Sequence, residues 1–383
     1  MEGLRGLAVL LVFFVHFHAL FGSYLSSRLV FRASEFLGTV GNSGVDLFFV
    51  MSGYLIYGAL IRRETGYFKF TSRRVRRIYP VFLAVFALYL ALSALFPQED
   101  KIHGGVFVAG RYILANLLLL PGIFNIHPII SVAWSLSYEF FFYLTLPVVV
   151  SLGRMRQWKA SRRLAAFALL WLLFGIASLH YGQDTRARMI SFIAGIVLYE
   201  LISAGRARFA LTIAGEFAAV ALVTASFAFF YEVHRPRSTS QINAFLPVFA
   251  LSAAFFFLSF YCFEYSSFLK RVFSWSPLRY LGNMSYSYYL IHGLTLEGVA
   301  LVWLKVGLPL SSLWAGLSAL VVGFCATWVT ASLLFFFVEK RYSLLPKPAY
   351  AMNAARTSSG MESSSDQETS TLDLPVRSRS QPV

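Results

Sequence analysis

The stretch LAVLLVFFVHFHALFGS, residues 7–23, contains no Asp, Glu, Lys or Arg. As an α-helix it is about 25 Å long, close to the ~30 Å hydrocarbon core of a bilayer. We interpret it as a retained membrane span rather than a signal peptide, because it lacks a clear small-residue cleavage site. Comparable apolar runs follow along the chain. The ten predicted spans are roughly 7–23, 44–61, 78–96, 132–152, 163–180, 187–203, 209–231, 244–263, 284–305 and 312–338.

The composition supports an all-α, polytopic membrane helix bundle. Hydrophobic residues make up 57% and charged residues 13% of the 383-residue chain, whereas soluble domains carry about 25% charged residues. The stretch 106–122 is also apolar, but Arg111, Asn116 and Pro121 interrupt it. We expect a re-entrant or interfacial helix there. The alternative is an additional span, which would invert the orientation of every later segment.

The charge distribution predicts how the bundle is oriented. The net charge is +15, but the basic residues form short clusters between the apolar runs. This placement is typical of a membrane protein and argues against a nucleic-acid partner. If the N-terminus is cytoplasmic and the spans alternate, most Lys and Arg fall in cytoplasmic loops, as the positive-inside rule requires. We therefore predict a multi-pass protein of the inner (plasma) membrane with both termini in the cytoplasm.

The chain is predicted to have one folded domain and a tail. Residues 1–345 form the transmembrane domain, whereas 346–383 are polar, rich in Ser and Thr, and predicted to be a disordered cytoplasmic tail. We expect no soluble catalytic domain, so any chemistry must occur within the bundle or at its faces. Cys262 and Cys325 lie inside apolar runs and give neither a disulfide framework nor a metal-ligand spacing.

The first span carries two ionisable side chains, whose insertion into a membrane costs free energy. An ionisable group deep in a bilayer costs at least ~2.5–3.5 kcal/mol. Arg5 and His16 are separated by about 16 Å along a helix, which places Arg5 at the headgroups and His16 near mid-bilayer. A neutral, desolvated imidazole can act as a general base. An equally weighted alternative is a histidine that only forms hydrogen bonds between helices.

A basic cluster, RRVRRIYP at residues 73–80, precedes the third span. Arg74 and Arg77 are three residues apart and therefore share one helix face, and guanidinium groups suit phosphate. The cluster can thus bind a phosphorylated ligand from the cytoplasm. The alternative is a topology signal that contacts lipid phosphates. A basic cluster considered by itself favours this alternative. Pro80 is expected early in the helix.

The fourth span opens with WSLSYE, residues 134–139. Trp134 is a plausible interfacial anchor, and Glu139 lies about one and a half turns further in. A carboxylate at that depth should be paired or protonated. It can orient the imidazole, bind acceptor hydroxyls or move a proton. The alternative is a structural ion pair with an arginine.

Two further polar segments enter spans. Asp46 begins the second span, in which we expect Ser52 and Gly53 to serve helix packing rather than chemistry. The segment 283–292, NMSYSYYLIH, places a second buried histidine, His292, in the ninth span. Three acidic residues without a surrounding motif are expected to be structural residues that face the bundle: Glu200, Glu216 and Glu297.

Five of these elements occur in an order that resembles a known family. They are LRGLAVLLVFFVHF (4–17), GVDLFFVMSGYLI (44–56), RRVRRIYP (73–80), WSLSYEFFFYLTLP (134–147) and MSYSYYLIH (284–292). The chain resembles the acyltransferase-3 family of membrane O-acyltransferases, from about residue 2 to 342. The resemblance implies transfer of an acetyl or other short acyl group from cytoplasmic acyl-coenzyme A. The implied acceptor is a hydroxyl, commonly on a sugar.

The resemblance also implies roles for single residues. The family's Arg and His in the first helix, with ten residues between them, correspond to Arg5 and His16, and His16 is then the essential catalytic histidine. The family's Arg-x-x-Arg motif corresponds to Arg74 and Arg77, which are linked to coenzyme A binding. Its tryptophan-to-glutamate motif corresponds to Trp134 and Glu139. The chain resembles the stand-alone members, which lack an extracytoplasmic hydrolase-like domain.

We therefore predict a membrane acyltransferase with acyl-coenzyme A, most commonly acetyl-coenzyme A, as donor. Its other partners are a carbohydrate or glycoconjugate acceptor and the lipid bilayer, with no metal and no nucleic acid. The predicted catalytic residues are His16 and Glu139, and the predicted donor-binding residues are Arg5, Arg74 and Arg77. The predicted substrate-binding residues are Asp46, Trp134, Tyr143, Ser287 and His292.

Two alternatives of other classes are a transporter or flippase for a glycan or lipid-linked intermediate, and a structural partner in polysaccharide export. A transporter shares the apolar spans and the buried ionisable residues. Transporters often show internal repeats and paired broken helices. The two halves of this sequence show no such similarity. Binding of acyl-coenzyme A to the purified protein separates the enzyme from both alternatives.

Overall fold

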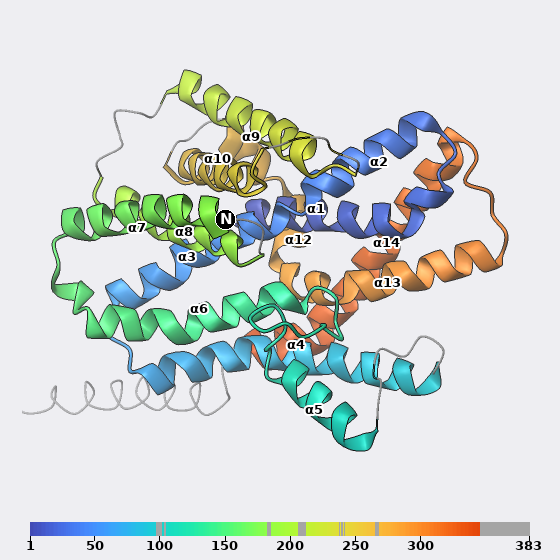
Figure 1. Cartoon of the computed structure of the whole chain (residues 1–383), viewed down its shortest axis with the longest axis horizontal. Coiled ribbons are helices and arrows are strands. Elements are labelled where there is room, and N and C mark those ends of the chain that lie inside the picture. The colour runs from blue at the N-terminus through green and yellow to red at the C-terminus, as the bar shows by residue number, and fades with distance from the viewer. Residues whose placement is uncertain are drawn as a thin grey trace, which may run out of the picture. The chain divides into compact units, whose positions relative to one another are not determined.

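The computed structural model describes residues 1–344 except 97–101, 103–104, 182–184, 206–211, 237, 239, 241 and 265–267. The predicted tail, 346–383, lies outside the described residues. Within them, all regular elements are helices (Figure 1). Short 3₁₀ segments are η1 (Gly22–Tyr24), η3 (Met155–Gln157) and η4 (Thr185–Met189), and η6 (Phe335–Leu344) is π-helical.

The helices follow one another as α1 (Glu2–Phe21), α2 (Arg28–Gly41), α3 (Gly44–Arg62), α4 (Tyr67–Leu95), α5 (Val106–Leu117), α6 (Ala133–Leu152), α7 (Ala160–Tyr181), α8 (Ile190–Ser203), α9 (Ile213–His234), α10 (Phe245–Glu264), α11 (Phe268–Phe273), α12 (Ser276–Asn283), α13 (Ser285–Lys305) and α14 (Leu313–Leu334). Each predicted span coincides largely with one of these helices. In the view of Figure 1, α9 and α10 lie along the top and α4 and α5 along the bottom, with α1, α3, α6 and α13 between them. The protein is an all-α, polytopic membrane bundle.

Eight helical segments in the described residues are long and apolar enough to cross a bilayer. One of them, Arg28–Arg62, combines α2 and α3. Two predicted spans are not among the eight: α8 has only 14 residues, and α13 includes Glu297 and Lys305. The contacts of α8 show how it crosses the bundle.

α8 lies beside α3 and runs in the same direction. Ser191, at the start of α8, contacts Asp46 at the start of α3. Near the other ends, Tyr57 donates a hydrogen bond to Glu200 over 2.5 Å. α8 therefore extends through the same depth of the bundle as most of α3.

Two glycines allow this close approach. A Cβ atom on Gly53 would lie 2.1 Å from the carbonyl oxygen of Phe192, and one on Gly195 would lie 2.0 Å from that of Val50. Real side chains cannot be accommodated at such distances, so α3 and α8 pack backbone to backbone. The predicted packing role of Gly53 is confirmed.

Three helices were not predicted: α2, α11 and α12. α2 carries Arg28, Arg32 and Glu35 among apolar residues and is amphipathic, so it gives no continuous apolar run. α12 packs on the first turn of α1, where Arg279 donates to Glu2 over 2.7 Å. Residues 276–283 thus lie at the same end of the bundle as the N-terminus.

α4 begins earlier than predicted. It starts at Tyr67, so the basic cluster is helical, and Pro80 lies inside the helix instead of near its start. The prediction for Pro80 is wrong because the apolar run marked only the part of the helix expected within the membrane. Lys and Arg favour helix nearly as well as Leu, so the helix continues through the polar residues.

α5 and the loop after it form a compact re-entrant unit. α5 has 12 residues, about 18 Å, which is too short to cross the bilayer. The amide oxygen of Asn116 accepts a hydrogen bond from the backbone of Ile129 over 2.8 Å, and its nitrogen donates to the carbonyl of His127. These bonds fold residues 118–132 back against the start of α6. A short helix thus lies where a re-entrant or interfacial helix was predicted, and its length argues against the alternative of an additional span.

Candidate active site

A cavity of about 420 Å³ lies between α1, α3, α4, α6 and α13. α3 lines it along its length, from Val45 at its start to Arg62 at its end. The cavity also receives Arg5 from α1, together with Arg74 and Arg77 from α4. The three predicted donor-binding arginines therefore share one cavity. Arg62, for which no binding role was predicted, adds a fourth guanidinium.

The two arginines of α4 are held differently. The guanidinium of Arg74 lies over the rings of Phe70 and Tyr143, 5.1 and 5.5 Å from their centroids. Arg77 forms an ion pair of 2.8 Å with Glu339. Both side chains line the cavity, which agrees with the predicted shared helix face.

Glu139 accepts hydrogen bonds from two hydroxyl groups. Ser52 donates to its Oε1 atom over 2.7 Å, and Tyr143 donates to the same atom. All three side chains line the cavity. The hydrogen-bond partners of Glu139 in the described structure are thus hydroxyls rather than the alternative arginine. Ser52 was expected to serve helix packing rather than chemistry; its hydroxyl also forms a hydrogen bond to Glu139.

The two predicted buried histidines meet. The rings of His16 on α1 and His292 on α13 have centroids 4.8 Å apart and planes inclined by 82°. The Nδ1 atom of His292 lies 3.0 and 2.9 Å from the carbonyl oxygens of Tyr288 and Tyr289. Because carbonyls only accept, Nδ1 is the protonated nitrogen of the neutral ring, and Nε2 carries a lone pair. That Nε2 atom is buried without a hydrogen-bond partner in the described structure.

One end of the cavity lies close to the histidine pair. Neither histidine lines it, but Tyr289 and Ser135 do. The hydroxyls of Tyr289 and Ser135 are 2.6 Å apart, and the Tyr289 ring centroid lies 6.0 Å from that of His292. On the side of the re-entrant loop, a Cβ atom on Gly293 would lie 3.7 Å from Ser131 Oγ and 3.9 Å from His16 Nδ1.

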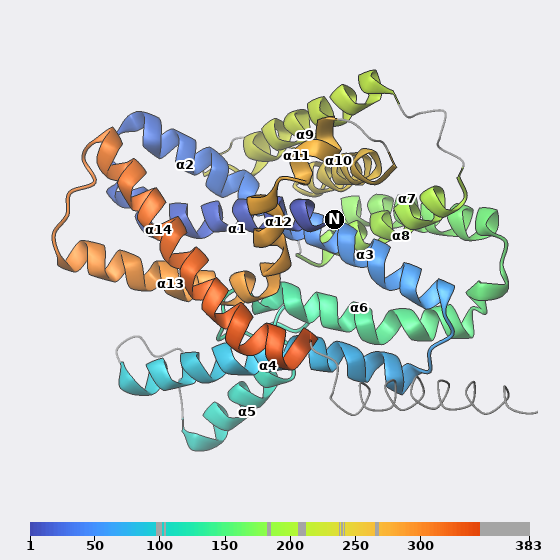
Figure 2. The same cartoon turned by 180° about the vertical axis from the view of Figure 1, so that it is seen from behind.

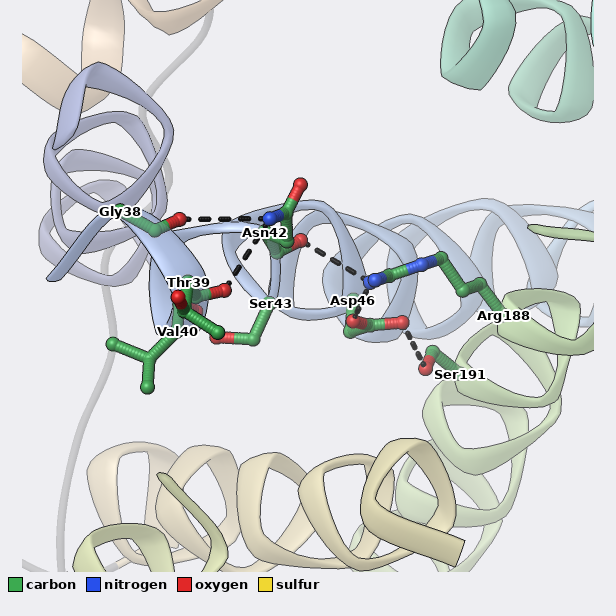
Figure 3. Close-up of polar contacts among 8 residues, drawn as sticks. All are labelled: Gly38, Thr39, Val40, Asn42, Ser43, Asp46, Arg188 and Ser191. Atoms are coloured by element: carbon green, nitrogen blue, oxygen red, sulfur yellow. Dashed lines mark hydrogen bonds and ion pairs between the residues drawn. The ribbon is translucent and has the colours of Figure 1, made fainter. Parts of the chain in front are cut away.

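Three predicted substrate-binding residues lie outside the cavity lining. Asp46 is fully buried and forms an ion pair with Arg188, which also donates to the carbonyl of Asn42, as Figure 3 shows. Ser287 donates to Glu339, and Trp134 packs edge-on against Tyr138. Of the other two, Tyr143 lines the cavity and His292 contacts His16.

Glu200 and Glu216 behave as predicted for structural residues facing the bundle. Glu200 is buried and bonded to Tyr57 and Arg163, and Glu216 accepts from the backbone of Leu269 over 2.5 Å. No group of three or more His, Cys, Asp or Glu side chains placed to hold a metal occurs among the residues that the structure describes.

A multi-pass helical bundle with a basic internal cavity beside a pair of contacting histidines fits a membrane-embedded enzyme. The model of the acyltransferase domain family, acyltransferase 3, matches residues 1–332. The chain belongs to this family, and its resemblance to it is confirmed.

Relatives carry names that agree with this membership. The chain is 28% identical to the exopolysaccharide production protein ExoZ of Rhizobium meliloti over 324 residues, 78% of this chain and 92% of that protein. It is 24% identical to the peptidoglycan O-acetyltransferase OatA of Listeria monocytogenes over 371 residues, 88% of this chain and 54% of OatA. It is 28% identical to the acyltransferase MdmB of Streptomyces mycarofaciens over 229 residues, 54% of this chain and 57% of MdmB. The chain thus spans only about half the length of two of these relatives. No solved structure matches it.

Proposed function

We propose that this acyltransferase moves an acetyl or other short acyl group from acyl-coenzyme A to a hydroxyl of a carbohydrate-containing acceptor. The observation that carries the proposal is the cavity shared by four arginines and Glu139, which reaches the layer of His16 and His292. Its volume, about 420 Å³, falls in the range of small-molecule sites. The names of the relatives support acyl transfer to polysaccharide.

The donor binds through its phosphates. Guanidinium groups bind phosphate oxygens through paired, charge-assisted hydrogen bonds. Arg74 and Arg77 hold the donor with help from Arg5, and Arg62 adds charge at the end of α3. With the N-terminus in the cytoplasm, the arginines face the compartment that contains acyl-coenzyme A. The thioester then extends along α3 toward Tyr289 and Ser135.

His16 acts as the catalytic base. Its imidazole takes the proton of the acceptor hydroxyl, the oxygen attacks the thioester carbonyl carbon, and the carbon–sulfur bond breaks to release the coenzyme A thiolate. The lone pair of His292 Nε2 is available beside the His16 ring to accept its other N–H, which would orient the base. Glu139 holds the acceptor or tunes the histidine. An alternative step, in which His16 briefly carries the acyl group, would leave a trappable acyl-histidine.

The donor and acceptor approach from opposite faces of an inner membrane. This arrangement explains why the site lies inside the bundle, and it follows from the predicted orientation with both termini in the cytoplasm. Mass spectrometry of surface glycans from cells with and without the protein identifies the acceptor. Loss of an acetyl-sized mass is the expected result.

The direct test uses the purified protein in proteoliposomes with labelled acetyl-coenzyme A and a glycan acceptor. His16→Ala should lower the transfer rate at least about 100-fold, the usual contribution of a general base. The matched control is His18→Ala, on the same helix, because His18 hydrogen-bonds Ser34 at 3.0 Å and does not contact the site. Normal transfer by correctly inserted His16→Ala would overturn the proposed role. Acceptor movement without acyl transfer would favour the transporter.

A further inference from the structure

Glu339 lies beyond residues 1–332 that the family model matches. It belongs to η6, the π-helical segment that continues α14. Figure 2 shows α14 running obliquely across the bundle toward α4. Stretches of π-helix are uncommon and frequently mark functional sites. No motif in the sequence indicated a role for this residue.

The carboxylate of Glu339 is fixed by two other elements. Its side chain is fully buried. Its Oε2 atom accepts from the backbone N–H of Ser287 over 3.1 Å and from the Ser287 hydroxyl over 2.5 Å. Its Oε1 atom lies 2.8 Å from Nη2 of Arg77. The contact with Arg77 is an ion pair without hydrogen-bond geometry, since Oε1 has no hydrogen-bond partner in the described structure. The start of α13 thus fixes the carboxylate, and the carboxylate attracts the guanidinium.

Arg77 keeps part of its side chain exposed to the cavity. The side chain is 27% exposed and lines the cavity, whereas its Nη1 atom is buried and has no hydrogen-bond partner in the described structure. Arg74 lies one turn earlier on the same helix, and Arg5 and Arg62 line the same cavity. Without a negative partner, these like charges would repel one another in the empty site. A fixed carboxylate behind Arg77 offsets that repulsion.

We infer that Glu339 is a positioning residue that holds the cavity-exposed part of the Arg77 side chain toward a phosphate of the acyl donor. The inference rests on the proposed donor site. Glu339 itself does not touch the donor. It orders the Arg77 side chain and offsets the repulsion between the arginines before the donor binds. The free-energy cost of binding is therefore lower, which is how preorganisation raises affinity. Ser287, which was predicted to bind substrate, would then act indirectly, by fixing the carboxylate of Glu339.

The test compares two donors on the full-length protein: acetyl-coenzyme A and S-acetylpantetheine, which lacks all phosphates. In Glu339→Gln, the KM for acetyl-coenzyme A should rise about tenfold, equivalent to about 1.4 kcal/mol. The KM for S-acetylpantetheine and both kcat values should stay unchanged. Arg77→Gln should show the same donor-specific rise, and the double variant should add little, because the two residues act as a unit.

The matched control is Glu200→Gln. Glu200 is also buried and bonded to an arginine and a hydroxyl, Arg163 and Tyr57, but it does not line the cavity. This variant should lower stability without changing the ratio of the two KM values. Ser287→Ala is a milder second variant that should shift the ratio in the same direction but less. If Glu339→Gln does not fold, the ratio of the two KM values can still be measured with Ser287→Ala.

Two outcomes would overturn the inference in different ways. If the wild type prefers acetyl-coenzyme A but Glu339→Gln and Ser287→Ala leave the KM ratio unchanged or lower it, Glu339 does not position Arg77 for the donor. If the wild type uses both donors with equal KM, the arginines do not bind phosphate. The proposed donor site then fails, and the inference fails with it.

Discussion

Glu139 is held by two hydroxyls from different helices, and one of them can be removed with little change in shape. Tyr143→Phe deletes the donor on α6 and leaves Ser52 as the partner. Hydrogen bonds to charged groups contribute about 1.5–3 kcal/mol, so a carboxylate that must be oriented for catalysis loses much of its order. We expect kcat/KM for acyl transfer to fall about tenfold or more.

The control for this substitution is Tyr57→Phe, which deletes the hydroxyl bound to Glu200, away from the cavity lining. Both variants should lower the thermal unfolding temperature, but only Tyr143→Phe should slow transfer. Equal rates for Tyr143→Phe and the wild type would show that the orientation of Glu139 by Tyr143 is not needed.

At the residue scale, the sequence predicted which side chains lie together when they belong to the same helix. The spacing of Arg74 and Arg77 along α4 sufficed to place both in one cavity. It could not predict that Ser52 bonds Glu139 or that Glu339 bonds Arg77, because each pair joins helices far apart in the chain. Asp46 shows the converse: a buried acid at a helix start is compatible with a ligand site or an ion pair, and only tertiary contact with Arg188 reveals the pair.

At the element scale, the re-entrant unit of α5 and residues 118–132 depends on one side chain. Asn116 is buried and bonds the backbone at His127 and Ile129. Asn116→Ala removes both bonds, each contributing about 0.5–1.5 kcal/mol, and leaves a buried N–H unpaired. Ser131 Oγ of this loop and His16 Nδ1 lie 3.7 and 3.9 Å from where a Cβ atom on Gly293 would stand, so loosening the loop should also disturb the site. We expect faster hydrogen exchange across 118–132 and a transfer rate reduced severalfold.

Asn243→Ala is the control for this substitution. Asn243 also bonds backbone groups, at Leu179 and Phe245, but it is only half-buried and does not line the cavity. It should leave both the exchange of residues 118–132 and the transfer rate unchanged. Unaltered exchange in Asn116→Ala would show that other contacts hold the loop.

Apolar runs identified the helices that cross the bundle but not those that lie along its faces. α2 and α12 are amphipathic helices that mix polar with apolar residues, so no run of bilayer length marks them. α8 is the opposite case, since it is short but almost entirely apolar, and its run was recognised. Length alone would have rejected it, whereas its contacts with α3 extend from Asp46 to Tyr57.

At the scale of the whole molecule, the count of crossings decides which loops face the same side. If α8 and α13 do not cross, only eight helical segments of the described residues do, and residues 268–283 fall on the side opposite the N-terminus. If both cross, these residues lie on the same side as the N-terminus. The bond from Arg279 to Glu2 favours the second arrangement, because α12 cannot pack on the first turn of α1 across a membrane.

Cysteine labelling tests this arrangement. Ser274→Cys and Leu308→Cys place thiols at exposed positions before α12 and between α13 and α14, in a background with Cys325→Ser because Cys325 is exposed. A membrane-impermeant maleimide added to intact spheroplasts should label position 308 and spare 274, and both should react after lysis. With eight crossings and a cytoplasmic N-terminus, both positions would react before lysis. If position 274 reacts and 308 is spared, the ten crossings stand but the orientation is inverted, and the arginines of the cavity face away from cytoplasmic acyl-coenzyme A.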